Sequence, residues 1–264
     1  MAKKKSPMRS AKLATKNIIA SNPVFANLFF ALFKEKISIA VKDKTISYYM
    51  NPLFGKPLKA IDRNGEYEGP FLSRMIDDML DFQKEDRVCY LDIGGSFGFD
   101  ILVLDTFLED DNTCITFEPN KFSRIYLRKN IADIPVKVVE KFVSDRSTQN
   151  SISIDDFCEA NGVEPTHIKI DIEGGEISAL KGMVKTLEQY KPKLYIEMHE
   201  IFIRKHFDME QQEIEDFFKT LTELGYKMEY NSHHYPLFSG SSEVYDYSWF
   251  SEKPNSELYA VVCQ

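Results

Sequence analysis

The chain has 264 residues, which is enough for one large domain or for one domain with an N-terminal extension. Hydrophobic residues make up 43% of the sequence, so we expect a substantial core rather than a disordered chain. The formal net charge of −8 argues against electrostatic binding of nucleic acid by the whole chain, and no nucleic-acid partner is expected.

The four cysteines show no metal-binding pattern. None belongs to a C-x-x-C pair or has a histidine at the spacing of a zinc site. Cys89, Cys114 and Cys263 lie in apolar, strand-like runs, which favours reduced thiols and a cytoplasmic protein. The N-terminus lacks the apolar stretch of a secretory signal, and no apolar stretch has the length of a membrane span.

Residues 1–70 are expected to form an N-terminal extension, and residues 71–264 the main domain. The first 16 residues contain six lysines and arginines and no acid, which is typical of a solvated tail. A helix is expected over 22–36, starting near Pro23, and it could dock on the main domain, lie on a membrane surface or bind a partner. The pattern of 37–50 predicts a β-hairpin, and a loop should follow.

From residue 71 onward, helical and strand-like segments alternate. Strands are expected at 88–94, 113–118, 136–144, 167–173, 193–199, 226–230 and 258–264. Helices are expected at 71–80, 101–108, 121–130, 153–157, 177–187 and 214–224. This order predicts an α/β fold with a mainly parallel sheet that is covered by helices on both faces.

A glycine-containing loop follows the first strand of this sheet. Asp92, Gly94 and Gly98 form the pattern D-x-G-x-x-x-G between a strand and a helix. Glycines let a backbone turn sharply and approach a ligand closely. In open α/β sheets, ligands bind beyond the carboxyl ends of the strands, so this loop is the expected cofactor site.

The next strand adds an acid to that site. Glu118 ends this strand, where a carboxylate can accept hydrogen bonds from ribose hydroxyls. The glycine spacing is not G-x-G-x-x-G, and Asp92 places a carboxylate where a pyrophosphate would prefer amide donors. A sulfonium cofactor with an ammonium group suits an acidic site better. The pattern therefore favours S-adenosylmethionine, with an NAD-dependent oxidoreductase as the alternative.

Ionisable residues mark the ends of two later strands. A period of two places Asp171 and Glu173 on one face of the fourth strand together with Lys169, which we interpret as a structural ion-pair partner. On the fifth strand, Glu197 and His199 share a face. Buried parallel strands are usually apolar, so these groups are expected at the open carboxyl edge of the sheet.

These acids and the histidine are the candidate proton acceptors for a hydroxyl nucleophile. The candidate catalytic residues are Asp171, Glu173, Glu197 and His199. His199 has the most suitable ordinary pKa. No ligand spacing requires a metal, and none is assigned, although a divalent metal held by the same four residues is an alternative.

Five sequence blocks resemble the FkbM family of class I methyltransferases. In order, the blocks are LDIGGSFG, FEPN, SIDDF, IKIDIEGGEISALKGM and KPKLYIEMHE, and they span roughly residues 88–200. The resemblance implies a Rossmann-like, mostly parallel seven-stranded sheet whose last strand, in LYAVVCQ, is reversed. It also implies S-adenosylmethionine as the cofactor and methylation of a hydroxyl on a sugar, glycan or other metabolite.

The resemblance further assigns residues to the cofactor. It places Asp92, Gly94, Ser96 and Gly98 around the methionine end, with Gly95 where the family more often has alanine. It places Glu118 on the ribose, with Pro119 and Asn120 in the turn, Ser144 and Asp145 near the adenine, and Asp171 in contact with cofactor or substrate. A different class of function, a non-catalytic adapter that binds a membrane or partner through residues 1–36, stays open.

Overall fold

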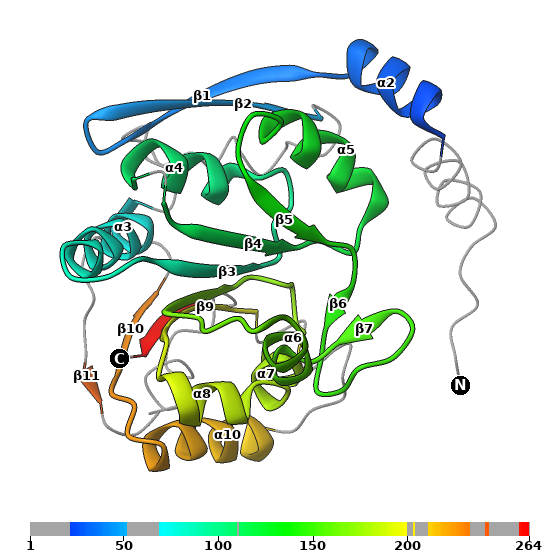
Figure 1. Cartoon of the computed structure of the whole chain (residues 1–264). Coiled ribbons are helices and arrows are strands. Elements are labelled where there is room, and N and C mark those ends of the chain that lie inside the picture. The colour runs from blue at the N-terminus through cyan, green and yellow to red at the C-terminus, as the bar shows by residue number, and fades with distance from the viewer. Residues whose placement is uncertain are drawn as a thin grey trace.

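The computed structural model describes residues 22–51, 69–109, 111–199, 203, 211–232, 241–242 and 259–263 (Figure 1). The expected basic tail and most of the loop after the hairpin lie outside these residues. Among the described residues, no helix has both the length and the hydropathy that crossing a membrane requires.

One large sheet organises the molecule. Its strands are β3 (Cys89–Ile93), β4 (Thr113–Phe117), β5 (Val136–Val139), β8 (His167–Ile170), β9 (Lys193–Met198), β10 (Met228–Ser232), β11 (Ser241–Ser242) and β12 (Tyr259–Cys263). The strand order is β11-β10-β12-β9-β8-β3-β4-β5. The strands from β9 to β5 are parallel, and β12 runs antiparallel between β9 and β10. The predicted Rossmann-like sheet with a reversed last strand is confirmed, and β11 adds a short edge strand.

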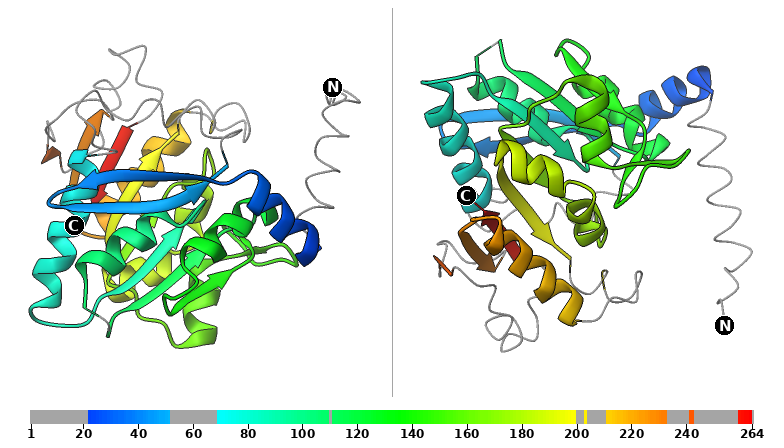
Figure 2. Two further views of the ribbon diagram at one scale, coloured as in Figure 1. Left: turned by 90° about the horizontal axis from the view of Figure 1, so that it is seen from above. Right: turned by 60° about the horizontal axis from the view of Figure 1, so that its bottom comes forward.

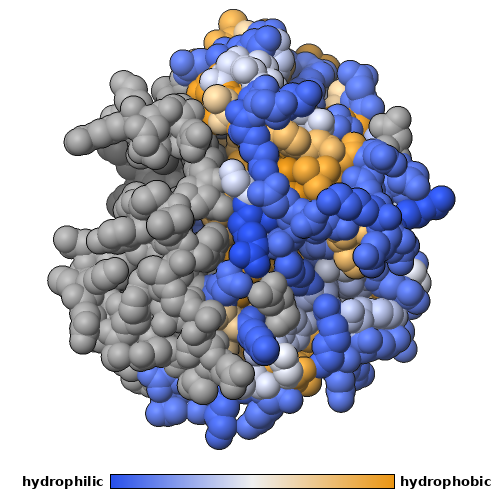
Figure 3. Space-filling view, turned by 90° about the vertical axis from the view of Figure 1, so that its left-hand side faces the viewer, coloured by the Kyte–Doolittle hydropathy of each residue, from blue (hydrophilic) through white to orange (hydrophobic). Residues whose placement is uncertain are grey.

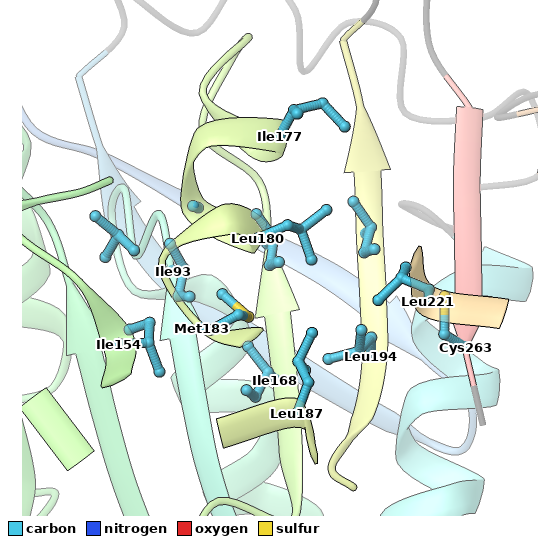
Figure 4. Close-up of a cluster of buried hydrophobic side chains, with 14 of the residues drawn as sticks. Ile93, Ile154, Ile168, Ile177, Leu180, Met183, Leu187, Leu194, Leu221 and Cys263 are labelled. Carbon is cyan, nitrogen blue, oxygen red and sulfur yellow. The ribbon is translucent and has the colours of Figure 1, made fainter. Parts of the chain in front are cut away.

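Helices cover both faces of this sheet (Figures 1 and 2). One layer contains α3 (Gly69–Gln83), α4 (Phe99–Phe107) and α5 (Lys121–Asn130). The other contains α6 (Ile154–Asn161), α7 (Glu176–Lys181), α8 (Val184–Tyr190) and α10 (Gln211–Glu223). Figure 4 shows side chains of β3, β8 and β9 packing against side chains of α7, α8 and α10, in the hydrophobic core between the sheet and this second layer of helices. Burial on both faces explains why these strands are rich in isoleucine and leucine.

The predicted hairpin packs outside the first helical layer. β1 (Glu35–Val41) and β2 (Lys44–Met50) are antiparallel, and they contribute buried side chains to the same hydrophobic cluster as α3 and α4. The buried hairpin residues are Ile39, Val41, Ile46, Tyr48 and Met50. Alternate residues of each strand therefore join the core of the main domain, as a period of two requires.

The predicted N-terminal helix is α2 (Pro23–Leu32), and only one of its faces is covered. Phe29 packs on Phe122 of α5 with ring centroids 5.0 Å apart, and Phe30 packs on Tyr126 at 5.4 Å. The other face carries exposed apolar side chains: Val24 71%, Phe25 49%, Leu28 53%, Leu32 66% and the following Phe33 38%. By contrast, the described part of the face beside α3 is mainly hydrophilic, with smaller hydrophobic areas (Figure 3).

Two predicted elements are divided in the structure. The strand expected over 136–144 ends at Val139, and β6 (Phe142–Val143) leaves the main sheet to pair with β7 (Ser151–Ile152). The helix expected over 177–187 breaks at Gly182 into α7 and α8. At the second break the Ser144 carbonyl lies so close to Gly182 that a Cβ there would stand 2.1 Å from its oxygen.

Candidate functional site

The predicted cofactor loop lies at the carboxyl end of β3. Asp92 and Ile93 end the strand, and the amides of Gly94 and Gly95 both donate to the carbonyl oxygen of Phe117 in β4. Gly94 has a φ of 110°, and a Cβ at this position would stand 1.9 Å from the carbonyl oxygen of Asp171. Glycine is therefore required here both by conformation and by space.

The loop ends where α4 begins. Gly98 is the N-cap of this helix with a φ of 85°, and its amide donates to Gly95 at 2.7 Å. Ser96 is exposed and also has a left-handed φ, of 44°. This compact loop brings backbone close to the strand ends, as close approach to a ligand requires.

Asp92 is buried in the middle of the site. Its carboxylate accepts a hydrogen bond from the Thr116 hydroxyl at 2.7 Å, and only 1% of the residue is exposed. Burial and the nearby Asp100 carboxylate raise the pKa of Asp92 to about 7, against the opposing effects of Lys169 and Thr116. A cationic cofactor beside Asp92 would favour its ionised form.

Glu118 joins the loop to the next strand. Its two carboxylate oxygens accept hydrogen bonds from the backbone amides of Ser96 at 2.8 Å and Asn120 at 2.7 Å. Asn120 in turn caps α5 by accepting from the Phe122 amide. Pro119 lies between these two bonded residues. Burial raises the pKa of Glu118, although the two amide bonds and Arg124 act in the opposite direction.

The segment expected near the adenine lies against α7. The Ser144 hydroxyl is 3.1 Å from the Ser178 hydroxyl, and the amide of Asp145 donates to Ser178 Oγ at 3.3 Å. This contact could not be predicted from the sequence, because nothing distinguishes Ser178 from other helix residues. The contact fixes the segment after β6 relative to the helix that follows β8.

A second group of side chains gathers where β8 and β9 end. The strands are in parallel register with Ile170 beside Ile196, so Asp171 follows on one strand beside Glu197 on the other. His199 Nε2 is 3.9 Å from Asp171 Oδ1 and 3.6 Å from Glu197 Oε1. The prediction that these three residues meet at the carboxyl edge of the sheet agrees with this geometry.

Glu173 does not join this group. β8 ends at Ile170, so the period of two does not continue to residue 173, and Glu173 is exposed in a turn with a φ of 50°. The expectation that it shares a strand face with Lys169 and Asp171 is wrong for this reason. Glu176, the first residue of α7, takes the interior position instead.

Glu176 contacts the Nδ1 atom of the His199 ring. It is fully buried at the start of α7, and its Oε1 lies 2.9 Å from His199 Nδ1 and accepts from the Gly174 amide at 2.9 Å. Burial lowers the pKa of His199, but the carboxylates of Glu176, Asp171 and Glu197 together raise it to about 9. His199 is therefore protonated at neutral pH in this state, and its ordinary pKa does not describe it.

Lys169 is the structural cation that the sequence suggested. It is 3% exposed, its Nζ donates to Asp100 Oδ2 at 2.5 Å, and Asp171 Oδ2 lies 3.8 Å away. Asp100 follows the glycine loop in α4, so this ion pair connects the loop to β8. Sequence reasoning found the lysine but missed its partner.

Three of these side chains could hold a metal ion. The ligand atoms of Asp171, Glu197 and His199 all lie within 4.8 Å of one another. The cofactor positions and this group lie at neighbouring strand ends, because Gly94 directly contacts the backbone of Asp171. The arrangement therefore has two adjoining parts, a loop that can hold a ligand and a set of proton-accepting or metal-binding groups.

The strand order, with β12 reversed between β9 and β10, is the one that the resemblance to class I methyltransferases implied. The family model described as "Methyltransferase FkbM domain" matches residues 107–228. This segment, somewhat less than half of the chain, is similar to the FkbM methyltransferases, and it contains Glu118 and the whole group around His199. The resemblance seen in the sequence is confirmed.

Several solved methyltransferase structures are similar to parts of the chain. A FkbM methyltransferase from Methylobacillus flagellatus is 18% identical with a TM-score of 0.46; the alignment covers 67% of this chain and 44% of that one. A precorrin-6y C5,15-methyltransferase from Geobacter metallireducens is 12% identical (73% and 88% covered, TM-score 0.42). An O-methyltransferase from Thermotoga maritima is 10% identical (86% and 77%, TM-score 0.42). No curated protein matches the chain.

Proposed function

We propose that the chain transfers the methyl group of S-adenosylmethionine to a hydroxyl group, on a sugar, a glycan or another small metabolite. The match to a methyltransferase family model supports methyl transfer over the alternative of NAD-dependent oxidation. The hydroxyl acceptor follows from the resemblance and from the acidic side chains at the strand ends, which can take up a hydroxyl proton.

The contact between Gly94 and Asp171 carries this proposal. It joins the loop assigned to the cofactor to the group of Asp171, Glu197 and His199 without intervening side chains. A methyl donor in the loop would therefore face these groups. Methyl transfer requires an in-line approach, and positioning of this kind can supply much of the rate.

Asp171 is the best-placed proton acceptor of the group. Its side chain is 28% exposed, compared with 7% for Glu197 and 11% for His199, so an acceptor molecule can reach it. His199 is unsuited to accept a proton while its pKa is about 9. We therefore assign the base to Asp171, and we assign Glu197 and His199 to positioning.

Formation of S-adenosylhomocysteine from S-adenosylmethionine tests the proposal, with a panel of sugar, phenol and amine acceptors. We expect turnover with a hydroxyl acceptor, and the Asp171→Asn variant should lower kcat by about 10²–10⁴-fold, as loss of a general base does. Glu173→Gln is the matched control, because this acid lies two residues away but is exposed and outside the group. Turnover with amines alone, or equal loss in both variants, would contradict the assignment.

We also propose that α2 contacts an anionic membrane surface. Its outer face carries the exposed Val24, Phe25, Leu28 and Leu32, and the exposed Lys34 and Lys36 follow the helix. The first 16 residues of the sequence add six basic residues and no acid. An apolar helix face beside basic residues is the pattern of an interfacial helix.

Sedimentation with lipid vesicles tests this contact. We expect the full chain to bind vesicles containing phosphatidylglycerol, to bind pure phosphatidylcholine weakly, and to be released by salt. The double variant Leu28→Ser/Leu32→Ser should lose binding, whereas Phe142→Ser, an equally exposed apolar residue on β6, should keep it. Binding that is equal in the two variants would refute a role for α2.

A further inference from the structure

We propose that Asp171, Glu197 and His199 bind a divalent cation of the Mg²⁺ or Mn²⁺ type at the carboxyl ends of β8 and β9. Two carboxylates and one imidazole supply the oxygen and nitrogen ligands that such ions accept. The binding itself does not depend on methyl transfer, whereas the use made of the ion rests on the proposed function.

The distances fit a site that closes slightly around its ion. Ligand atoms about 2.1 Å from one ion lie at most about 4.2 Å apart. His199 Nε2 is 3.6 Å from Glu197 Oε1 and 3.9 Å from Asp171 Oδ1, within that limit, and all three ligand atoms lie within 4.8 Å of one another. Asp171 and Glu197 would therefore move toward the ion as it binds.

Glu176 provides separate support for a cation site, because its buried carboxylate has one oxygen without a hydrogen bond among the described residues. Its residue is 0% exposed, and its Oε2 has no hydrogen-bond partner among the described residues. Its Oε1 faces His199 Nδ1 at 2.9 Å, which directs Nε2 toward Asp171 and Glu197. A carboxylate behind a histidine in this way is the usual outer partner of a metal-binding imidazole.

The imidazole of His199 lies among negative charges. Three carboxylates, those of Asp171, Glu176 and Glu197, surround it. An ion bound to Nε2 would therefore have two carboxylates beside it, which favours a divalent cation.

Partial exposure leaves room for a further ligand. Asp171 is 28% exposed, so one side of the ion would face the acceptor molecule or water. A divalent ion there would polarise a bound hydroxyl and make its proton easier to remove. The same residues would thus position the acceptor oxygen next to the loop that contacts Asp171.

Isothermal titration of the full chain with MnCl₂ alone tests the site, after the protein has been treated with a chelator. We expect one Mn²⁺ to bind per chain and excess Mg²⁺ to displace it. The affinity for Mn²⁺ should be at least tenfold lower in Asp171→Asn and in Glu197→Gln. Glu173→Gln should bind as the wild type does. Glu176→Gln should weaken binding about 10- to 100-fold, as loss of an outer partner does.

Thermal unfolding with and without MnCl₂ provides a second readout that does not need activity. Wild type and Glu173→Gln should be stabilised by the ion, and Asp171→Asn, whose side chain is the most exposed of the three, should fold but not respond. Absence of Mn²⁺ binding to the wild type, or equal binding by Asp171→Asn, would overturn the site. Binding of Mn²⁺ without any binding of S-adenosylhomocysteine would leave the cation site standing and refute the methyltransferase proposal instead.

Discussion

At the scale of single residues, the inner wall of the site depends on a fit between Gly95 and Thr116. Thr116 donates a 2.7 Å hydrogen bond to Asp92, and a Cβ on residue 95 would stand 2.0 Å from that hydroxyl oxygen. The glycine is therefore matched to the threonine on the neighbouring strand, and the two together hold the Asp92 carboxylate.

This fit predicts a coupled pair of substitutions. Gly95→Ala should destabilise the fold by about 1–3 kcal/mol, because the added methyl group displaces the Thr116 hydroxyl. In a Thr116→Ala background the same change should cost clearly less, since the clashing oxygen is gone. Urea unfolding of the four proteins measures the coupling. Additive effects would show that the two residues do not compete for space.

Asp92 predicts a dependence of stability on pH. Its pKa rises from 3.8 to about 7 on folding, so the folded protein binds the proton more tightly than the unfolded chain. The contribution of Asp92 to the free energy of unfolding therefore decreases as the pH rises from about 4 to about 7. Asp92→Asn removes this penalty, and its stability relative to wild type should be higher by a few kcal/mol at pH 8 and by less at pH 5.

Urea unfolding at both pH values checks this prediction. Asp92→Asn should bind S-adenosylhomocysteine more weakly despite its greater stability, because the cofactor's ammonium group loses a carboxylate. A variant that is less stable than wild type at pH 8 would show that the buried charge is compensated in the folded protein.

At the scale of elements, periodicity predicted the fold well but not the ends of its strands. The strands at Cys89–Ile93 and Lys193–Met198 follow from short apolar runs, and their shared edge follows from parallel pairing. The turn after Ile170, which sends Glu173 outward and Glu176 inward, depends on tertiary packing. Thr116 and Asp100 were missed for the same reason, since their partners lie far away in the sequence.

Two glycines at helix ends predict different responses to substitution. Gly162 ends α6 with a φ of 62° and has open space around it, whereas Gly182 ends α7 with a φ of −85° beside the Ser144 carbonyl. Gly162→Asn should be nearly neutral, because asparagine tolerates a left-handed conformation. Gly182→Asn should cost about 1–3 kcal/mol or more by overpacking, as thermal unfolding would show. Equal losses would contradict this distinction.

At the scale of the whole molecule, the site lies on a single edge of the sheet. The carboxyl ends of β3 and β9 and the segments after β3, β4, β8 and β9 supply the residues of the two adjoining parts, and helices cover both faces of the sheet (Figure 1). The hairpin and α2 lie outside the first helical layer, so the surface proposed for membrane contact belongs to a different part of the molecule.

We propose above all that the loop after β3 and Glu118 together bind S-adenosylmethionine. Calorimetric titration with S-adenosylhomocysteine tests it most directly, using wild type, Glu118→Gln and the exposed control Glu109→Gln. We predict micromolar binding by wild type and control, and at least about tenfold weaker binding by Glu118→Gln, because a charged hydrogen-bond acceptor is worth about 1.5–3 kcal/mol. Absence of binding by the wild type, or equal affinity in all three proteins, would contradict the account.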